Sequence, residues 1–167
     1  MMAINIRPEL PADASAIEAI TVSAFLPAEH TRHTEQLIVE GLRKSGALTL
    51  SLVAENLGAI IGHVAVSPVV ITDGSAGWYG LGPLSVNPEC QKRGFGSELM
   101  REALRRLREL GASGCVVLGD PRYYERFGFK TEFGLILPDV PPEYFMAVAF
   151  GSFTPRGVVS YHEAFRA

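Results

Sequence analysis

Apolar residues in the first third of the chain switch between the spacing of a strand and the spacing of a helix. The pattern predicts a first strand over residues 4–7 and a helix that starts from the capping residue Asp13 and ends near Phe25. A second helix is expected to begin after Thr34 and to end at Gly46, where glycine readily adopts a left-handed cap. The residues expected to face inward from this second helix are Leu37, Ile38 and Leu42.

Three longer apolar runs then predict three consecutive antiparallel strands. They cover residues 48–55, 59–71 and 78–86. Turn signals separate them, Asn-Leu-Gly at 56–58 and Asp-Gly at 73–74. The strands lead directly into a glycine-rich segment.

An amphipathic helix is predicted after that segment, followed by a short buried strand. From Ser97 to the closing Gly111, leucine, methionine and alanine recur on one face. Residues 115–118 are wholly apolar, which is typical of a central strand that runs parallel to the 78–86 strand across the intervening helix.

The last third of the chain predicts one short helix and two more strands. Pro121 suits the first turn of a helix that ends at Gly128, and a final pair of strands is expected around 145–150 and 158–164. Residues 1–167 are therefore expected to form one mixed α/β domain, with a central, mostly antiparallel sheet of six or seven strands flanked by about four helices.

Residues 81–97, LGPLSVNPECQKRGFGS, join the 78–86 strand to the amphipathic helix through a glycine-rich turn. Gly94 and Gly96 allow a positive φ and a close approach of the backbone, and the first N–H groups of a helix have no partner within it. Such a helix start attracts phosphate groups, and Lys92 and Arg93 can add positive charge. The run fits neither a Walker loop nor a G-x-G-x-x-G dinucleotide fingerprint.

The pattern that remains is Gln91-x-x-Gly94-x-Gly96. It resembles the acyl-CoA pyrophosphate motif of the GNAT superfamily of N-acetyltransferases, and the segment PRYYERFGF at 121–129 resembles its YhbS-like branch in particular. The resemblance extends over nearly the whole chain. It implies the GNAT acyl-CoA N-acyltransferase fold, in which one parallel strand pair splays apart at the cofactor site, with acetyl-CoA as cofactor and an amine as acceptor.

The resemblance also implies which residues contact the cofactor. The end of the 78–86 strand would bind the pantetheine arm, and the glycine-rich turn would hold the pyrophosphate. Pro83 and Pro88 agree with an opening beside this strand, because proline cannot donate to a strand ladder. The residues assigned to acetyl-CoA (CoA) on this basis are Leu84, Ser85, Val86, Gln91, Lys92, Arg93, Gly94, Phe95, Gly96, Ser97 and Tyr123.

In the superfamily an amine attacks the thioester directly, through a tetrahedral intermediate, and an acid protonates the departing thiolate. Tyr124 occupies the tyrosine position of a Y-x-x-x-G-F pattern, and the resemblance implies this role for it. The alternative is an aromatic packing residue, with Tyr123 as the second candidate for the acid. Many members have an asparagine upstream of the tyrosine, where this chain has Leu-Gly-Asp-Pro at 118–121.

A base must accept a proton from the ammonium form of the acceptor, and the candidates are Glu55, His63 and Asp120. An imidazole has an ordinary pKa of about 6.5, which suits the task, although a histidine in a strand is more often a packing residue. Asp120 is expected to cap the last helix rather than to act as the base. No ligand spacing indicates a metal. The residues expected to recognise the acceptor lie around the connection of the first two helices and are Phe25, Glu29 and His30, with Thr31 and His33 nearby.

The composition of the chain indicates which kinds of partner and which cellular location to expect. The chain of 167 residues has a formal net charge of -3, which counts against electrostatic binding of nucleic acid, and the arginines of the 97–111 helix alternate with glutamates as on a solvated face. Cys90 and Cys115 are too few for a disulfide framework or a zinc site. With no secretory signal and no run of about eighteen apolar residues, a cytoplasmic location away from membranes is expected. Exposed strand edges are compatible with a homodimer.

Three functions are compatible with the sequence. The first is transfer of an acetyl group from acetyl-CoA to a primary amine of a small-molecule or peptidic acceptor. The second is a CoA or acyl-CoA sensor that keeps the fold without turnover. The third is a toxin that acetylates aminoacyl-tRNA, against which the negative net charge argues.

Overall fold

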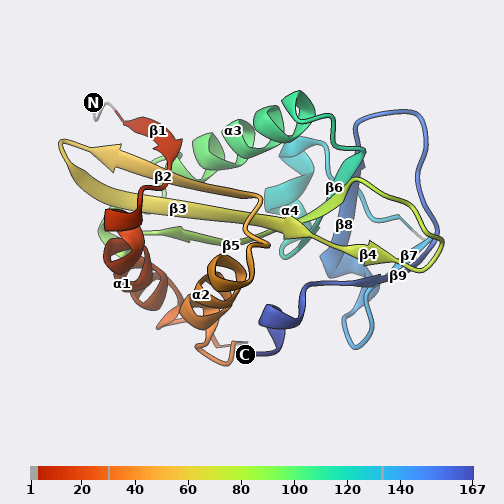
Figure 1. Ribbon diagram of the computed structural model, residues 1–167, viewed down its shortest axis with the longest axis horizontal. Helices are drawn as coiled ribbons and strands as arrows, with labels where there is room; N and C mark the ends of the chain where they lie inside the picture. The colour runs from red at the N-terminus through yellow and green to blue at the C-terminus, as the bar shows by residue number, and fades with distance from the viewer. Residues whose placement is uncertain (1–3, 30, 133) are drawn as a thin grey trace.

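The computed structural model describes residues 4–29, 31–132 and 134–167. Within these residues a six-stranded sheet forms the centre of the molecule, in the order β1-β2-β3-β5-β6-β8 (Figure 1). Neighbouring strands are antiparallel except for β5 and β6, which are parallel. The strands of this sheet are β1 (Asn5–Pro8), β2 (Leu50–Asn56), β3 (Ala59–Pro68), β5 (Trp78–Val86), β6 (Gly114–Leu118) and β8 (Phe145–Ala149).

Helices cover both faces of the central sheet. α1 (Ala14–Phe25) and α2 (Glu35–Ser45) lie on one face, and α3 (Phe95–Glu109) lies on the other together with the short α4 (Pro121–Tyr124) (Figure 1). Successive side chains of a strand point to opposite faces, so β2 contributes to two cores. Leu52 packs under α3, whereas Val53 packs against α1 and α2.

A second, smaller sheet lies on the face opposite α3, at the end formed by β5, β6 and β8. Among the described residues its strands are β4 (Val70–Ile71), β9 (Gly157–Ser160) and β7 (Leu135–Ile136), in the order β4-β9-β7. Its apolar residues Ile71 and Val159 share a core with Trp78 and Val116 of the central sheet. This face is therefore covered at one end by α1 and α2 and at the other by the small sheet.

The strand expectations need two corrections. The run expected over 59–71 is interrupted after Pro68, which cannot donate to a ladder, and its last part becomes β4 of the small sheet. The expected final pair of strands does not form a pair. β8 joins β6, whereas β9 joins β4 and β7, and the residues after β9 include a short 3-10 helix, η5 (Glu163–Arg166).

The helix expectations hold with local differences. α3 begins at Phe95 rather than Ser97, because Gly94 takes a positive φ of 87° and ends the preceding loop. In α2, Leu37 is 52% exposed, and the neighbouring Val39, at 2%, is the residue that faces the core. Asp13 precedes α1 as expected, but its carboxylate does not cap that helix.

β5 and β6 pair over a short stretch only. The paired positions are Trp78 with Gly114, Tyr79 with Cys115 and Gly80 with Val116. Further along β5, Gly82 has a φ of 140°, and the register with β3 shifts between Val64 and Val66. β5 nevertheless stays paired with β3 as far as Val86, so one of its edges is released from β6 while the other is held. The expected splayed parallel pair is confirmed.

The start of this parallel pair depends on a glycine. A Cβ atom at Gly114 would lie 2.3 Å from Trp78 Cη2 and 2.6 Å from the carbonyl oxygen of Val148. Gly114→Ala should therefore lower the free energy of unfolding by about 3 kcal/mol, the upper part of the usual range for overpacking, as measured by urea denaturation. Gly151→Ala is the control, since a Cβ there meets no atom within 4 Å. Equal stability of the two variants would contradict this packing.

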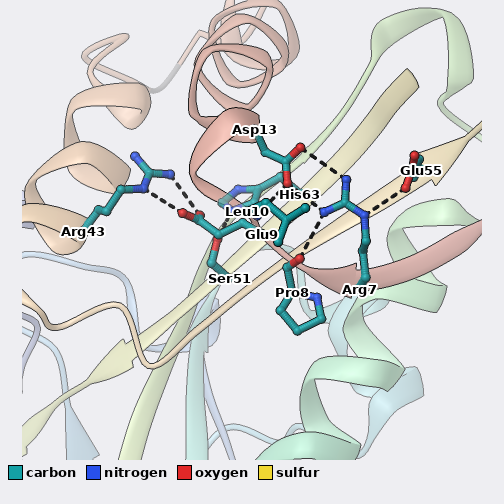
Figure 2. Close-up of polar contacts among 9 residues, drawn as sticks. All are labelled: Arg7, Pro8, Glu9, Leu10, Asp13, Arg43, Ser51, Glu55 and His63. Carbon is teal, nitrogen blue, oxygen red and sulfur yellow. Dashed lines mark hydrogen bonds and ion pairs between the residues drawn. The ribbon is translucent and has the colours of Figure 1, made fainter. Parts of the chain in front are cut away.

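Arg7 ties the first strand to the start of α1 (Figure 2). Its guanidinium donates to both carboxylate oxygens of Asp13, at 2.7 and 3.2 Å, and to Glu55 Oε2 at 2.8 Å. Asp13 also accepts a bond of 2.7 Å from the backbone N–H of Leu10. Asp13 thus fixes the chain before α1 instead of capping the helix.

A second group of polar contacts passes from α2 into the sheet (Figure 2). Arg43 binds Glu9 with two parallel bonds of 2.8 and 2.9 Å, and Ser51 Oγ donates to Glu9 Oε1. His63 Nε2 lies 2.8 Å from Ser51 Oγ. Because the single hydroxyl proton of Ser51 goes to Glu9, His63 Nε2 must be the donor to Ser51. Nδ1 of His63 is then the unprotonated nitrogen, and it is buried with no partner among the described residues.

Protonation of His63 should destabilise the fold. Burial lowers the pKa of His63 from 6.5 to about 4, although the Glu9 carboxylate opposes this shift. The unfolded chain therefore binds a proton that the folded chain does not, and stability is lost as the pH falls from about 6.5 to about 4, by about 3 kcal/mol for the full shift. Urea denaturation over this range measures the loss. His63→Gln should flatten the pH dependence, and an unchanged slope would show that another group causes it.

Candidate functional site

The loop between β5 and α3 presents the start of a long helix to solvent. Gln91 Nε2 donates to the carbonyl oxygen of Val86 at 3.1 Å, which ties the loop to the end of β5. Lys92 and Gly94 both have a positive φ, of 64° and 87°. The backbone bond from Glu98 N–H to Gly94 O, of 3.1 Å, begins the helical pattern, so the N–H groups before it have no partner within the helix.

A cleft of about 410 Å³ lies over this loop. Among its described lining residues Lys92 and Arg126 are cationic and none is acidic. The Arg126 guanidinium lies 4.9 Å from the centre of the Tyr123 ring. A Cβ at Gly94 would meet no atom within 4 Å, and one at Gly96 would lie 3.1 Å from Tyr123 Oη. The cleft therefore combines N–H groups that have no partner within the helix, positive charge, and open space over Gly94, which together suit an anionic ligand.

Most of the residues assigned to the cofactor from the sequence line this cleft. Ser85 does not, because its side chain is buried on the other face and donates to Thr21 Oγ1 at 3.5 Å. Arg93 is also not among the lining residues. The sequence did not predict Arg126, although its position three residues after Tyr123 places both on one side of the turn. The assigned residues that do line the cleft are Leu84, Val86, Gln91, Lys92, Gly94, Phe95, Gly96, Ser97 and Tyr123.

A second cavity, of about 510 Å³, adjoins the cleft. Phe25 of α1 and Leu84 of β5 line both, so the two spaces meet at these side chains. The other described lining residues are Glu35, Ile38, Leu81, Gly82, Pro83, Leu118, Tyr124, Leu137, Pro138, Val140, Tyr161 and Phe165. The second cavity is thus mostly apolar and opens beside the released edge of β5.

The two neighbouring tyrosines of α4 divide between the two spaces. Tyr123 lines the cleft, and Tyr124 lines the second cavity. Gly119 makes room for Tyr124, because a Cβ at Gly119 would lie 2.5 Å from Tyr124 Cε2. Burial, helped by Tyr123, raises the pKa of Tyr124 to about 12. Tyr124 is therefore a protonated phenol at neutral pH and can donate a proton.

The base candidates from the sequence are held elsewhere. Neither Glu55 nor His63 lines the cleft or the second cavity, since Glu55 pairs with Arg7 and His63 is fully buried beside Ser51. This geometry argues against both as the general base. Asp120 caps α4, as expected, by accepting a bond of 2.9 Å from Arg122 N–H.

The acceptor residues expected from the sequence are only partly brought to the site. Phe25 lies at the junction of the two spaces, whereas Glu29 is exposed and lines neither. His30 lies outside the described residues. Thr31 Oγ1 accepts a local bond of 2.6 Å from His33 N–H. The sequence did not predict Glu35, which lines the second cavity from the first turn of α2.

Two other kinds of site are absent from the described residues. None of the helices that they form has both the length and the apolar character needed to cross a bilayer. No three of their His, Cys, Asp and Glu side chains are grouped so that they could hold a metal ion. The ion pairs of Arg105 with Glu102 and Glu109 confirm that α3 presents a solvated charged face.

Known proteins are similar to this chain in both sequence and structure. Residues 48–131 match the acetyltransferase (GNAT) domain. YhbS of Escherichia coli (strain K12), an uncharacterized N-acetyltransferase, is 40% identical over 126 residues, which are 75% of this chain and 72% of YhbS. The resemblance to the GNAT superfamily and its YhbS-like branch is thereby confirmed.

Solved structures extend the match to nearly the whole chain. A GNAT family acetyltransferase from Brucella melitensis, in complex with acetyl-CoA, is 48% identical, with a TM-score of 0.88 and 99% of both chains covered. YhbS from Escherichia coli in complex with CoA is 33% identical, with a TM-score of 0.89, and the match covers 100% of this chain and 94% of that one. On this evidence of fold, loop and sequence, the chain belongs to the GNAT family of acetyltransferases.

Proposed function

We propose that this protein transfers the acetyl group of acetyl-CoA directly to a primary amine of a small-molecule or peptidic acceptor. The observation that carries the proposal is the junction at Phe25 and Leu84, where the cationic cleft meets the second cavity. Two relatives of matching fold were solved with such a ligand bound: the Brucella melitensis protein with acetyl-CoA and the Escherichia coli protein with CoA. The cleft would hold the cofactor, and the second cavity would hold the acceptor.

The residues of the cleft fit a CoA molecule. The N–H groups in the first turn of α3, with Lys92 and Arg126, would bind the pyrophosphate. The released edge of β5 offers backbone groups to the pantetheine arm, in the direction of Leu84 and the second cavity. When bound, acetyl-CoA supplies a thioester whose acetyl group an amine nitrogen can take while the thiolate leaves.

Tyr124 would act as the general acid. Its phenol lines the second cavity beside Leu84 and carries its proton at neutral pH, so a thiolate that forms nearby could take that proton. The ammonium group of the acceptor first loses a proton to solvent. The free amine then forms a bond to the acetyl carbon, the carbon–sulfur bond breaks, and the Tyr124 O–H proton passes to the departing sulfur. Solvent takes the remaining excess proton from the nitrogen and returns one to the phenolate. Glu55 and His63 take no part in this scheme, because neither lines the site.

Gly96→Asp tests the cofactor cleft. Gly96 lies in the first turn of α3, where an aspartate favours the helix. The new Cβ would press only on the hydroxyl end of the Tyr123 side chain, at 3.1 Å, so the fold should survive. Its carboxylate would repel a pyrophosphate at this position, and CoA affinity should fall by about a hundredfold or more in isothermal titration calorimetry. Gly96→Ala is the control for bulk alone and should lose much less. CoA affinity equal to that of the unsubstituted protein in the aspartate variant would disprove the site.

Tyr124→Phe tests the acid. The substitution keeps the ring that packs over Gly119 and removes only the hydroxyl. We expect kcat for acetyl transfer to fall by roughly a hundredfold to ten-thousandfold with CoA affinity unchanged. Tyr123→Phe is the matched control, because its hydroxyl lies over the loop near Gly96. A large loss in the Tyr123 variant and none in the Tyr124 variant would reverse the assignment. CoA binding without turnover on any amine would instead favour a sensor.

A further inference from the structure

The second cavity carries one partly buried carboxylate in mostly apolar surroundings. Glu35 is the only charged residue among the described residues that line it. Its Oε1 atom is buried and has no hydrogen-bond partner among the described residues. A buried carboxylate oxygen is costly unless it is paired, so its position is explained if a cationic group occupies the cavity.

Among the described residues, the surrounding walls offer no such pairing. The neighbouring side chains are aliphatic or aromatic, among them Ile38, Leu137 and Phe165. The one other polar group of this kind is Tyr161, which lines the cavity and has a buried hydroxyl without a partner in the described part of the chain. Burial raises the pKa of Tyr161, so its hydroxyl stays neutral and can accept or donate a hydrogen bond but cannot neutralise Glu35.

Glu35 is held in place by contacts at both ends of α2. Thr34 Oγ1, next to Glu35, donates to the carbonyl oxygen of Ala167 at 2.9 Å. A Cβ at Gly41 would lie 3.1 Å from Ala164 Cβ, so α2 packs closely against η5. Arg43, in the last turn, is bound by Glu9. The carboxylate therefore belongs to an anchored helix, which suits a group that must recognise a ligand.

We propose that Glu35 binds the ammonium group of the acceptor, and that the acceptor is an apolar amine without a carboxylate of its own. This inference rests on the proposed acetyl transfer, because it assigns the second cavity to the acceptor. The apolar walls would bury the hydrocarbon part, and Glu35 would select for positive charge. A free amino acid would be rejected, since the described lining offers no cation for its carboxylate.

Three probes of one shape test the proposal on the unsubstituted, CoA-saturated protein. They are 2-phenylethylamine, its neutral analogue 2-phenylethanol, and phenylalanine, which adds a carboxylate to the amine. Isothermal titration calorimetry should show binding of the amine, and binding at least tenfold weaker for the alcohol and the amino acid. Equal affinity for the amine and either analogue, or no binding of the amine at millimolar concentration, would overturn the proposal.

Substitution of Glu35 provides the second test. Glu35→Gln keeps the shape and removes the charge, and it should weaken binding of 2-phenylethylamine at least tenfold while leaving the affinity for CoA unchanged. Glu18→Gln is the matched control, because Glu18 is exposed on α1 and lines neither space. It should change neither affinity. Unchanged binding of the amine by the Glu35 variant would overturn the proposal.

An error in the assignment of Glu35 and an error in the proposed acetyl transfer would give different experimental results. If CoA binds and amines are acetylated but Glu35→Gln has no effect on amine affinity or KM, the assignment of Glu35 is wrong and acetyl transfer stands. If the amine binds in a Glu35-dependent manner but CoA does not bind, acetyl transfer is wrong and the cavity is an amine site of another kind, which also overturns the claim that Glu35 serves an acceptor. Loss of amine affinity with raised KM and little change in kcat is the result expected.

Discussion

The early end of the pairing between β5 and β6 is the constraint on which the whole site depends. A parallel ladder that continued past Gly80 and Val116 would engage the backbone of β5 on both edges. Gly82, with its positive φ, and Pro83, without an N–H, stand where that ladder would have to continue. The antiparallel pairing with β3 runs on to Val86 and keeps β5 in place. The strand is therefore rigid on one side and open on the other, which is what a ligand that binds along a strand requires.

Two spaces of opposite electrostatic character meet beside this open edge. The cleft over the α3 start has Lys92 and Arg126 and no acidic residue in its described lining, whereas the second cavity has Glu35 and no cation. The described lining therefore places positive charge in the cleft and negative charge in the second cavity, with apolar Phe25 and Leu84 between them. This separation favours the proposed transfer from an anionic cofactor to an acceptor that binds as an ammonium ion, because each ligand would be repelled by the space that suits the other. Tyr123 and Tyr124 follow the same division, although they are adjacent in the chain.

The sequence predicted the cleft well and the second cavity poorly, and the reason is the distance over which each is specified. The turn at Gly94 needs a positive φ and a helix start, and both requirements are local, so Gln91 to Ser97 could be assigned from one short run. The second cavity is assembled from segments between Phe25 and Phe165, and no spacing along the chain shows that Glu35 and Tyr124 line the same cavity.

The position of His63 could not be predicted for the same reason. Its strand was predicted, but which face it occupies depends on the register with β2 and on the cover by α1 and α2, which place it beside Ser51. The arrangement of β8 and β9 was missed for the same reason, because both read as apolar strands and only the tertiary structure sends them to different sheets.

The polar contacts around Glu9 belong to the site indirectly, through α2. Surface ion pairs contribute little to stability, but the two parallel bonds between Arg43 and Glu9 are partly shielded, and Ser51 fixes the carboxylate from the sheet side. They determine where the last turn of α2 lies, while Thr34 holds its start and Gly41 packs its middle against η5. A helix anchored at both ends cannot rotate to bring Glu35 to solvent without breaking one of these contacts. The Oε1 atom of Glu35, which has no partner among the described residues, is therefore maintained in the cavity by the packing of the rest of the fold, in the way that proteins maintain costly groups at functional sites. The buried His63, which the sequence suggested as a base, is better understood as part of this support.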